Sequence, residues 1–200
     1  HELLDIIGGN SRVVPYLDIP VQHVSTRILK AMNRRYSGEE VVDLVAEIRR
    51  RIPNAALRTT LLLGFPGETE EDVRVVESFL REHELDHVGV FGYANEEGSA
   101  AQKLSAQVEE EETQARLERI LALQSEISQR RLKRFVNTVE PVLIEGVSRE
   151  SDLLLEGRTR YQAPDIDGCV LINEGETRSG QIVAVEITEA QTYDLVGRLV

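Results

Sequence analysis

Composition excludes several classes of protein for this chain of 200 residues, which has 35 acidic and 23 basic side chains and a formal net charge of −12. The length predicts one large or two small domains, and a hydrophobic content of 41% suffices for a folded core. No apolar run reaches the roughly 20 residues that cross a bilayer. The acidic balance argues against a broad phosphate-binding face, which needs clustered Lys and Arg, and favours a basic protein partner.

A single cysteine, Cys169, limits the metal and redox chemistry that the chain can carry. One thiol cannot form an intramolecular disulfide, a four-cysteine zinc site or the ligand set of an iron–sulfur cluster. Low cysteine usage is also typical of the reducing cytoplasm, where we expect the protein to act. The chain begins with His1 instead of Met, and we interpret it as a piece of a longer protein.

The N-terminal part of the chain alternates short apolar runs with amphipathic segments. Residues 13–21 (VVPYLDIPV) predict a strand, and residues 26–33 predict a short helix. A longer helix is expected to begin at Ser37, because Ser37 and Glu40 have the spacing of a capping box. That helix should end before Pro53, which lacks a backbone donor.

Two further strands are predicted at residues 57–63 and 85–93, with a helix between them whose start is capped by Thr69 and Asp72. This strand–helix alternation predicts parallel pairing with right-handed crossovers. A long helix at about residues 109–135 follows. It begins with glutamates and ends with Arg and Lys, the order that complements the helix dipole.

The pattern changes near residue 136. Residues 137–200 hold five short β-rich runs separated by Gly, Asn and Pro, which predict a small five-stranded antiparallel barrel of the oligonucleotide-binding (OB) type. We therefore predict two domains, an α/β domain at residues 1–136 and an all-β domain at residues 137–200.

Polar residues near the strand ends are candidates for chemistry. Arg58 and Thr60 share one side of a predicted parallel strand, where both sides are normally apolar. Polar groups there cost stability unless they are paired or bind a ligand. The loop at residues 64–69 (GFPGET) joins a strand end to a helix start, where ligands bind in parallel α/β proteins. Internal hydrogen bonding and tight turn packing remain open as alternatives for both features.

The histidines do not have the spacing of metal ligands. They are His1, His23, His83 and His87. His23 alone follows the carboxyl end of a predicted strand, and we favour a structural role for it over metal ligation or acid–base catalysis.

Several stretches together resemble the radical SAM methylthiotransferases, the MiaB/RimO family. They are YLDIPVQHVS at residues 16–25, MNRR at 32–35, RTT at 58–60, LGFPGETE at 63–70 and FGYANEEGS at 91–99. The combination of YLDIPVQH with GFPGET resembles the RimO branch. The runs APDIDG at residues 163–168, ITEA at 187–190 and YDLVG at 193–197 resemble the TRAM domain of that branch.

The resemblance implies a fold and an activity. Residues 1–136 would be the C-terminal half of a radical SAM partial TIM-like α/β barrel, and residues 137–200 a TRAM domain. The family branch adds a methylthio group to the β-carbon of an aspartate in small-subunit ribosomal protein twelve. It uses S-adenosylmethionine (SAM) and two [4Fe-4S] clusters. The family's cluster cysteines are absent from these residues, so the chain alone is expected to be inactive.

The resemblance also implies that one wall of the SAM pocket lies in this chain. The residues of that wall are Gln22, His23, Ser25, Arg58, Thr60, Gly64, Gly67, Glu68 and Tyr93. Arg58 would pair with the SAM carboxylate. No catalytic or metal-ligating residue is assigned. In the TRAM domain, Asp165 and Asp167 are the candidate contacts for a basic partner.

Two alternatives to the ribosomal-protein activity remain. The first is the tRNA-modifying MiaB branch, which is disfavoured because residues 137–200 hold 12 acidic and five basic side chains and would repel phosphate. The second is a non-catalytic binding module. We also expect the chain to self-associate, because a half-barrel leaves an open sheet edge.

Overall fold

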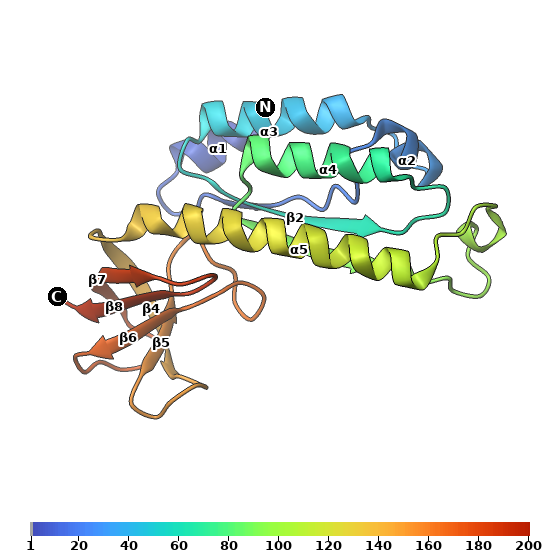
Figure 1. Ribbon diagram of the computed structural model, residues 1–200. Coiled ribbons are helices and arrows are strands. Elements are labelled where there is room, and N and C mark those ends of the chain that lie inside the picture. Colours follow the sequence, from blue (N-terminus) through green and yellow to red (C-terminus); the bar gives the residue numbers. More distant parts are fainter. Residues whose placement is uncertain (1) are drawn as a thin grey trace. The chain divides into compact units, whose positions relative to one another are not determined.

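The computed structural model describes residues 2–200, so His1 lies outside the described part (Figure 1). These residues form two compact units. One comprises residues 17–124, and the other joins the segment up to Tyr16 to residues 125–200. Within residues 2–200, no helix has both the length and the apolar character needed to cross a bilayer.

A three-stranded sheet in the order β1–β2–β3 is the framework of the unit at residues 17–124. Its strands are β1 (Tyr16–Asp18), β2 (Ala56–Leu63) and β3 (His87–Gly92). β2 and β3 pair in parallel, and Gln22 forms a further parallel bridge with Leu61. The predicted parallel pairing is therefore confirmed.

The first strand is shorter than the sequence predicted. Residues 13–21 were expected to be extended, but regular pairing is confined to β1. Pro15 and Pro20 flank it, and neither has an N–H to donate to a sheet ladder. Beyond β1, single hydrogen bonds continue the contact with β2, from Ile19 N to Arg58 O and from Gln22 N to Thr60 O, both 2.9 Å.

The helices follow the predicted order. They are α1 (Glu2–Gly9), α2 (Thr26–Ala31), α3 (Gly38–Arg51), α4 (Glu70–His83) and α5 (Glu110–Leu132), with 3-10 turns η1 (Ala101–Lys103) and η2 (Lys133–Phe135). The capping box of α3 is confirmed. Ser37 Oγ accepts from Glu40 N at 3.2 Å, and Glu40 Oε2 accepts from Ser37 N at 2.8 Å. α1 was not predicted.

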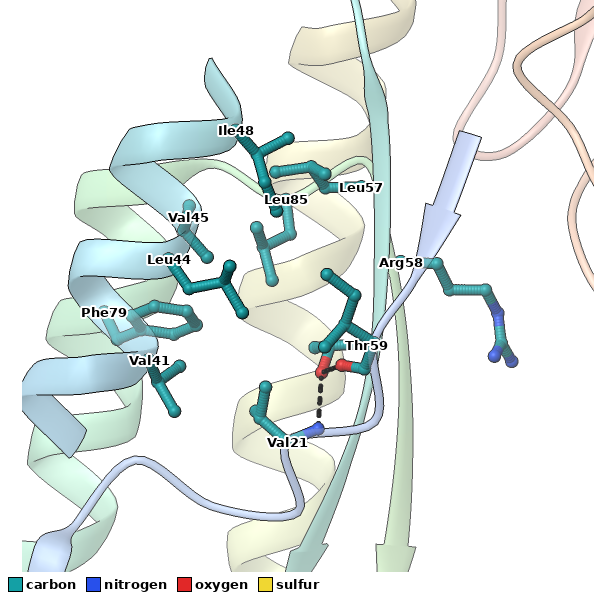
Figure 2. A pocket seen from close by; sticks show the side chains of 11 residues that line it. Val21, Val41, Leu44, Val45, Ile48, Leu57, Arg58, Thr59, Phe79 and Leu85 are labelled. Atoms are coloured by element: carbon teal, nitrogen blue, oxygen red, sulfur yellow. Dashed lines mark hydrogen bonds between the residues drawn. The ribbon is translucent and has the colours of Figure 1, made fainter. Parts of the chain in front are cut away.

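Apolar side chains of α3 and α4 pack against one face of the sheet (Figure 2). Val41, Val45 and Ile48 of α3 are buried there, whereas Leu44 of the same helix is 39% exposed. The cavity among these side chains measures about 20 Å³, room for one water at most. This part of the face is therefore core, and the cavity within it is too small for a ligand. Arg58 points away from it (Figure 2).

The second unit contains a closed barrel in the order β4–β5–β6–β8–β7. Its strands are β4 (Val139–Val147), β5 (Leu155–Arg158), β6 (Val170–Glu174), β7 (Ile182–Ala190) and β8 (Leu195–Leu199). Four of the five pairings are antiparallel, but β6 and β8 pair in parallel because β8 inserts between β6 and β7. Leu132 and Phe135 join the barrel core, so the end of α5 packs with the barrel.

Candidate functional site

The sheet face opposite α3 and α4 carries the polar side chains Arg58 and Thr60 beside the apolar Leu62 and Phe91. Side chains alternate along β2, so Leu57, Thr59, Leu61 and Leu63 are buried while Arg58, Thr60 and Leu62 face the other side. Gly89 of β3 belongs to the same face. A side-chain Cβ there would lie 3.5 Å from Arg58 Nη2 and 3.7 Å from Thr60 Oγ1. The nearest atom to that Cβ would be Cε2 of Phe91, at 3.3 Å, so the Phe91 ring, Arg58 and Thr60 surround Gly89 and a side chain there would crowd the ring.

Arg58 already has an acidic partner on this open face. Its Nη1 lies 2.9 Å from Asp18 Oδ2, and the two side chains are 15% and 38% exposed. A cation and a carboxylate side by side match the two charges of an amino-acid group, whose carboxylate would bind Arg58 and whose ammonium would bind Asp18. Any carboxylate ligand must therefore compete with Asp18 for Arg58, or bind both residues together.

A pocket of about 290 Å³ lies at the carboxyl end of the same face. Its size is at the lower limit of small-molecule sites. It is lined by Gln22, Ala31, Met32, Asn33, Arg34, Leu62, Phe65, Ala100, Ala101 and Leu104. Gln22 and Asn33 have positive φ angles of 65° and 58°, a conformation that is uncommon outside glycine and recurs at ligand sites. We call the pocket formed by these ten residues the strand-end pocket.

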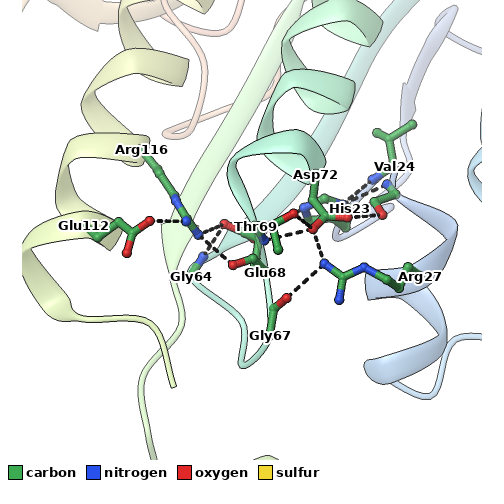
Figure 3. Close-up of polar contacts among 11 residues, drawn as sticks. His23, Val24, Arg27, Gly64, Gly67, Glu68, Thr69, Asp72, Glu112 and Arg116 are labelled. Carbon is green, nitrogen blue, oxygen red and sulfur yellow. Dashed lines mark hydrogen bonds and ion pairs between the residues drawn. The ribbon is translucent and has the colours of Figure 1, made fainter. Parts of the chain in front are cut away.

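Behind the strand ends lies a buried polar cluster centred on Glu68 (Figure 3). Glu68 Oε1 accepts from Gly64 N at 3.0 Å and from Arg116 Nη1 at 2.8 Å. Glu68 Oε2 lies 3.3 Å from His23 Nε2, and both of those side chains are fully buried. We call Glu68, His23, Arg116 and the Gly64 amide the Glu68 cluster.

His23 has a structural role in this cluster. Its Nδ1 accepts hydrogen bonds from the backbone N–H groups of Val24 and Ser25, both at 2.9 Å. Because Nδ1 accepts twice, the proton of the neutral ring sits on Nε2, which faces Glu68. His23 therefore fixes the loop that follows β1 and is not exposed to a ligand.

Asp72 anchors the same region from α4 (Figure 3). Its carboxylate accepts from Ser25 Oγ at 2.6 Å and from the N–H and hydroxyl of Thr69 at 2.8 and 2.6 Å, and it pairs with Arg27. Burial opposes ionisation of Asp72, but these hydrogen bonds outweigh it and lower the pKa of the carboxyl from 3.8 to about 2. The predicted Thr69–Asp72 cap is present, and it also fixes the start of α2.

The glycines of the loop at residues 64–69 permit close packing. Gly64 has a φ of 75°, and a Cβ there would lie 2.3 Å from Thr113 Oγ1 of α5. Gly67 has a φ of 86°, and its carbonyl accepts from Arg27 Nη2 at 2.9 Å. Side chains at these positions would force the loop away from α5 or strain its backbone.

The residues predicted for a SAM wall fall into separate groups. Arg58 and Thr60 lie on the open face, and Gln22 lines the strand-end pocket. His23, Ser25 and Glu68 are buried behind the loops. Gly64 and Gly67 shape the turn, while Tyr93 packs edge-on against Phe65 with ring centroids 5.4 Å apart. Their role toward SAM stays a prediction.

Sequence reasoning missed Asp18 and Arg116 as parts of these arrangements. Asp18 alternates with apolar neighbours in YLDIPV, which predicts that its side chain lies on the same face as other polar residues. The pattern does not predict that Asp18 pairs with Arg58. Nothing local marks Arg116, which lies 48 residues from Glu68.

The two candidate aspartates of the barrel unit differ in their exposure and in their hydrogen bonds. Asp167 Oδ2 accepts from Tyr16 Oη at 2.7 Å and from Ala163 N at 2.8 Å, so this carboxylate holds its own loop. Asp165 is exposed and lies 3.2 Å from Arg149, which is exposed too. Exposed pairs of this kind are weak and can be exchanged for a partner's cation.

Within residues 2–200, no group of three or more His, Cys, Asp or Glu side chains is arranged to hold a metal ion. Burial and the nearby carboxylates of Asp194 and Glu156 raise the pKa of the Cys169 thiol to about 12. Thiolates are the form that binds metals. Cys169 is therefore a poor metal ligand.

Comparison with known proteins gives matches along the chain. The radical SAM superfamily matches residues 1–80, and the TRAM domain matches residues 136–200. A relative from Desulfotalea psychrophila is 52% identical over 100% of the chain and 45% of its own length. Relatives from Geobacter sulfurreducens and Protochlamydia amoebophila are 44% and 41% identical, over 99% and 100% of the chain and 44% and 42% of their own lengths.

All three relatives carry the name ribosomal protein uS12 methylthiotransferase RimO. The chain spans less than half the length of these relatives.

The lowered pKa of Asp72 predicts a pH dependence of stability. The Asp72 carboxyl takes up its proton near pH 3.8 in the unfolded chain, but only near pH 2 in the folded protein. The stabilisation, up to about 2 kcal/mol, is therefore present above pH 4 and lost as the pH falls toward 2. Urea unfolding measures the free energy of unfolding at pH 5 and at pH 2.5. The difference between these two values should be smaller for Asp72→Asn than for the unmodified chain.

Asp43→Asn is the matched control, since Asp43 is exposed on α3. If Asp43→Asn reduced the pH-dependent difference in unfolding free energy as much as Asp72→Asn does, the assignment of this pH dependence to Asp72 would be wrong.

Proposed function

Because the chain belongs to the radical SAM methylthiotransferase family, we propose that it forms part of an enzyme that adds a methylthio group to the β-carbon of an aspartate in ribosomal protein uS12. The observation that carries this proposal is identity of 41–52% along essentially the whole chain to relatives of that name. We propose that residues 1–136 belong to the radical SAM domain and residues 137–200 to the TRAM domain. A ribosomal substrate is consistent with action in the cytoplasm.

The open face has the chemistry that SAM requires. Arg58 would bind the methionine carboxylate, Asp18 the ammonium group, and Thr60, which lies beside Gly89 on the same face, a further polar group. Gln22 and the adjoining strand-end pocket would hold the rest of the molecule. The Glu68 cluster would keep the loops after β1 and β2 in place around it. Bound SAM supplies the radical chemistry that activates the substrate carbon.

An iron–sulfur cluster does not fit the residues of this chain. Cys169 is its one cysteine, whereas a cluster needs several thiolates. We propose that the enzyme uses two [4Fe-4S] clusters held by residues outside these 200, and that these residues alone are inactive.

The charge of the barrel unit supports a protein substrate. Residues 137–200 carry a net charge of −7, which attracts a basic protein and repels RNA phosphates. We propose Asp165 as a direct contact, since it is exposed, and Asp167 as the residue that holds the loop in position. tRNA modification of the MiaB type is the less favoured alternative.

A reconstitution assay tests the substrate. The enzyme, extended to the length of the relatives and loaded anaerobically with its clusters, receives SAM, sulfide and a reductant with either uS12 or unmodified tRNA. Mass spectrometry should detect the methylthio group on an aspartate of uS12. Modification of tRNA alone would overturn the substrate and leave the family assignment intact.

The proposed role of Arg58 predicts a loss of SAM affinity. In the extended enzyme, Arg58→Ala should weaken SAM binding by tenfold or more, since a hydrogen bond to a charged group contributes about 1.5–3 kcal/mol. Equilibrium binding of radiolabelled SAM measures the effect. Arg74→Ala is the control, because Arg74 is 63% exposed on α4. Unchanged affinity in Arg58→Ala would remove Arg58 from the pocket.

A further inference from the structure

The strand-end pocket has one charged residue in its lining, the cation Arg34. Gln22 and Asn33 are the other polar residues that line it, and the remaining side chains are apolar. No carboxylate lines the pocket, although the chain as a whole has a net charge of −12. The pocket therefore favours a ligand group that is small and negatively charged.

Arg34 is not paired within the part of the chain that the structure describes. Among residues 2–200, no carboxylate forms an ion pair with its guanidinium and no oxygen accepts a hydrogen bond from it. Three other arginines of the same unit have acidic partners, namely Arg27 with Asp72, Arg58 with Asp18 and Arg116 with Glu68. Arg34 is exposed, so its guanidinium is accessible to a group that enters the pocket from solvent.

The backbone at Arg34 is fixed by the end of α2. Asn33 N donates to Lys30 O at 3.0 Å, and Arg34 N donates to Leu29 O at 2.8 Å. Together with the left-handed conformation of Asn33, which has a φ of 58°, these two bonds form a Schellman motif. The side chain of Arg34 therefore starts from an ordered point at the pocket.

SAM does not need this cation. In the proposed function, the SAM carboxylate binds Arg58, and the strand-end pocket holds the sulfonium and the adenosine. Neither of these groups is an anion, and the positive sulfonium repels a guanidinium. The proposed binding of SAM therefore leaves Arg34 without a ligand group.

A second carboxylate takes part in the proposed reaction. The substrate aspartate is modified on its β-carbon, and the side-chain carboxylate is bonded directly to that carbon. The β-carbon has to come close to the part of SAM that lies in the pocket, so the carboxylate comes close to the pocket as well. A carboxylate that leaves water for such a site requires a charged or hydrogen-bonding partner.

We propose that Arg34 binds the side-chain carboxylate of the substrate aspartate and selects aspartate over uncharged residues. This role rests on the proposed function, which supplies the substrate. A guanidinium presents two parallel N–H donors that match the two oxygens of a carboxylate. Fixing the carboxylate also fixes the β-carbon to which it is bonded. The amide of asparagine is uncharged and has one acceptor oxygen, so it cannot form the same pair of bonds.

Binding of uS12 to the extended enzyme tests this role without catalysis. The enzyme is loaded with its clusters and with SAM but receives no reductant, so that uS12 binds and is not modified. Isothermal titration calorimetry compares uS12 with a uS12 variant in which the target aspartate is replaced by asparagine. The unmodified enzyme should bind uS12 about tenfold more tightly than this variant, the effect of losing a hydrogen bond to a charged group.

Arg34→Gln should remove this preference, because its side chain is uncharged. The variant enzyme should bind uS12 about tenfold more weakly than the unmodified enzyme does and should bind both forms of uS12 alike. Its affinity for radiolabelled SAM should not change. Arg35→Gln is the matched control, since Arg35 is the next residue, is exposed and does not line the pocket. This control should keep the preference for aspartate.

Two outcomes would overturn the role of Arg34 and leave the proposed function intact. One is that Arg34→Gln still prefers aspartate, or that the unmodified enzyme binds both forms of uS12 alike. The other is a loss of SAM affinity in Arg34→Gln as large as that in Arg58→Ala, because Arg34 would then bind SAM. If uS12 neither binds the unmodified enzyme nor is modified by it, the proposed function fails, and the role of Arg34 fails with it.

Discussion

The buried carboxylate of Glu68 is the interaction on which the candidate site depends. One side chain joins the amide of Gly64 after β2, the ring of His23 after β1 and the guanidinium of Arg116 on α5 (Figure 3). A buried charge is tolerated only when it is paired and hydrogen-bonded. Each partner must therefore stay in place for the others to be satisfied, and three separate segments are held in one arrangement.

The two sides of the sheet differ because side chains alternate along β2. The side covered by helices is packed around Val41, Val45 and Ile48, and the cavity among these side chains has room for about one water (Figure 2). The other side presents Arg58 and Thr60 and leads to the strand-end pocket. With the loops fixed from behind, this face can receive a ligand without having to be ordered first, which lowers the entropic cost of binding.

Local signals in the sequence were sufficient for much of the fold. The cap at Ser37 and Glu40 and the five strands of the barrel depend on residues close in sequence, and both are confirmed. The site was harder to predict. His23 and Glu68 follow strand ends, as ligand-binding residues do, but both side chains are fully buried. Glu68 pairs there with Arg116, which lies 48 residues further along the chain. Long-range pairing of this kind has no signature in a single sequence, nor has the parallel pairing of β6 with β8.

Amide hydrogen exchange measured by NMR tests most directly whether the Glu68 cluster holds the loops. The amides of Gly64, Val24 and Ser25 donate to the side chains of Glu68 and His23. In the unmodified chain these amides should exchange as slowly as the amides of β2. Their exchange should be faster in Glu68→Gln and unchanged in the exposed control Glu71→Gln. Exchange at the rate of open loops in the unmodified chain, or no change in Glu68→Gln, would contradict this account.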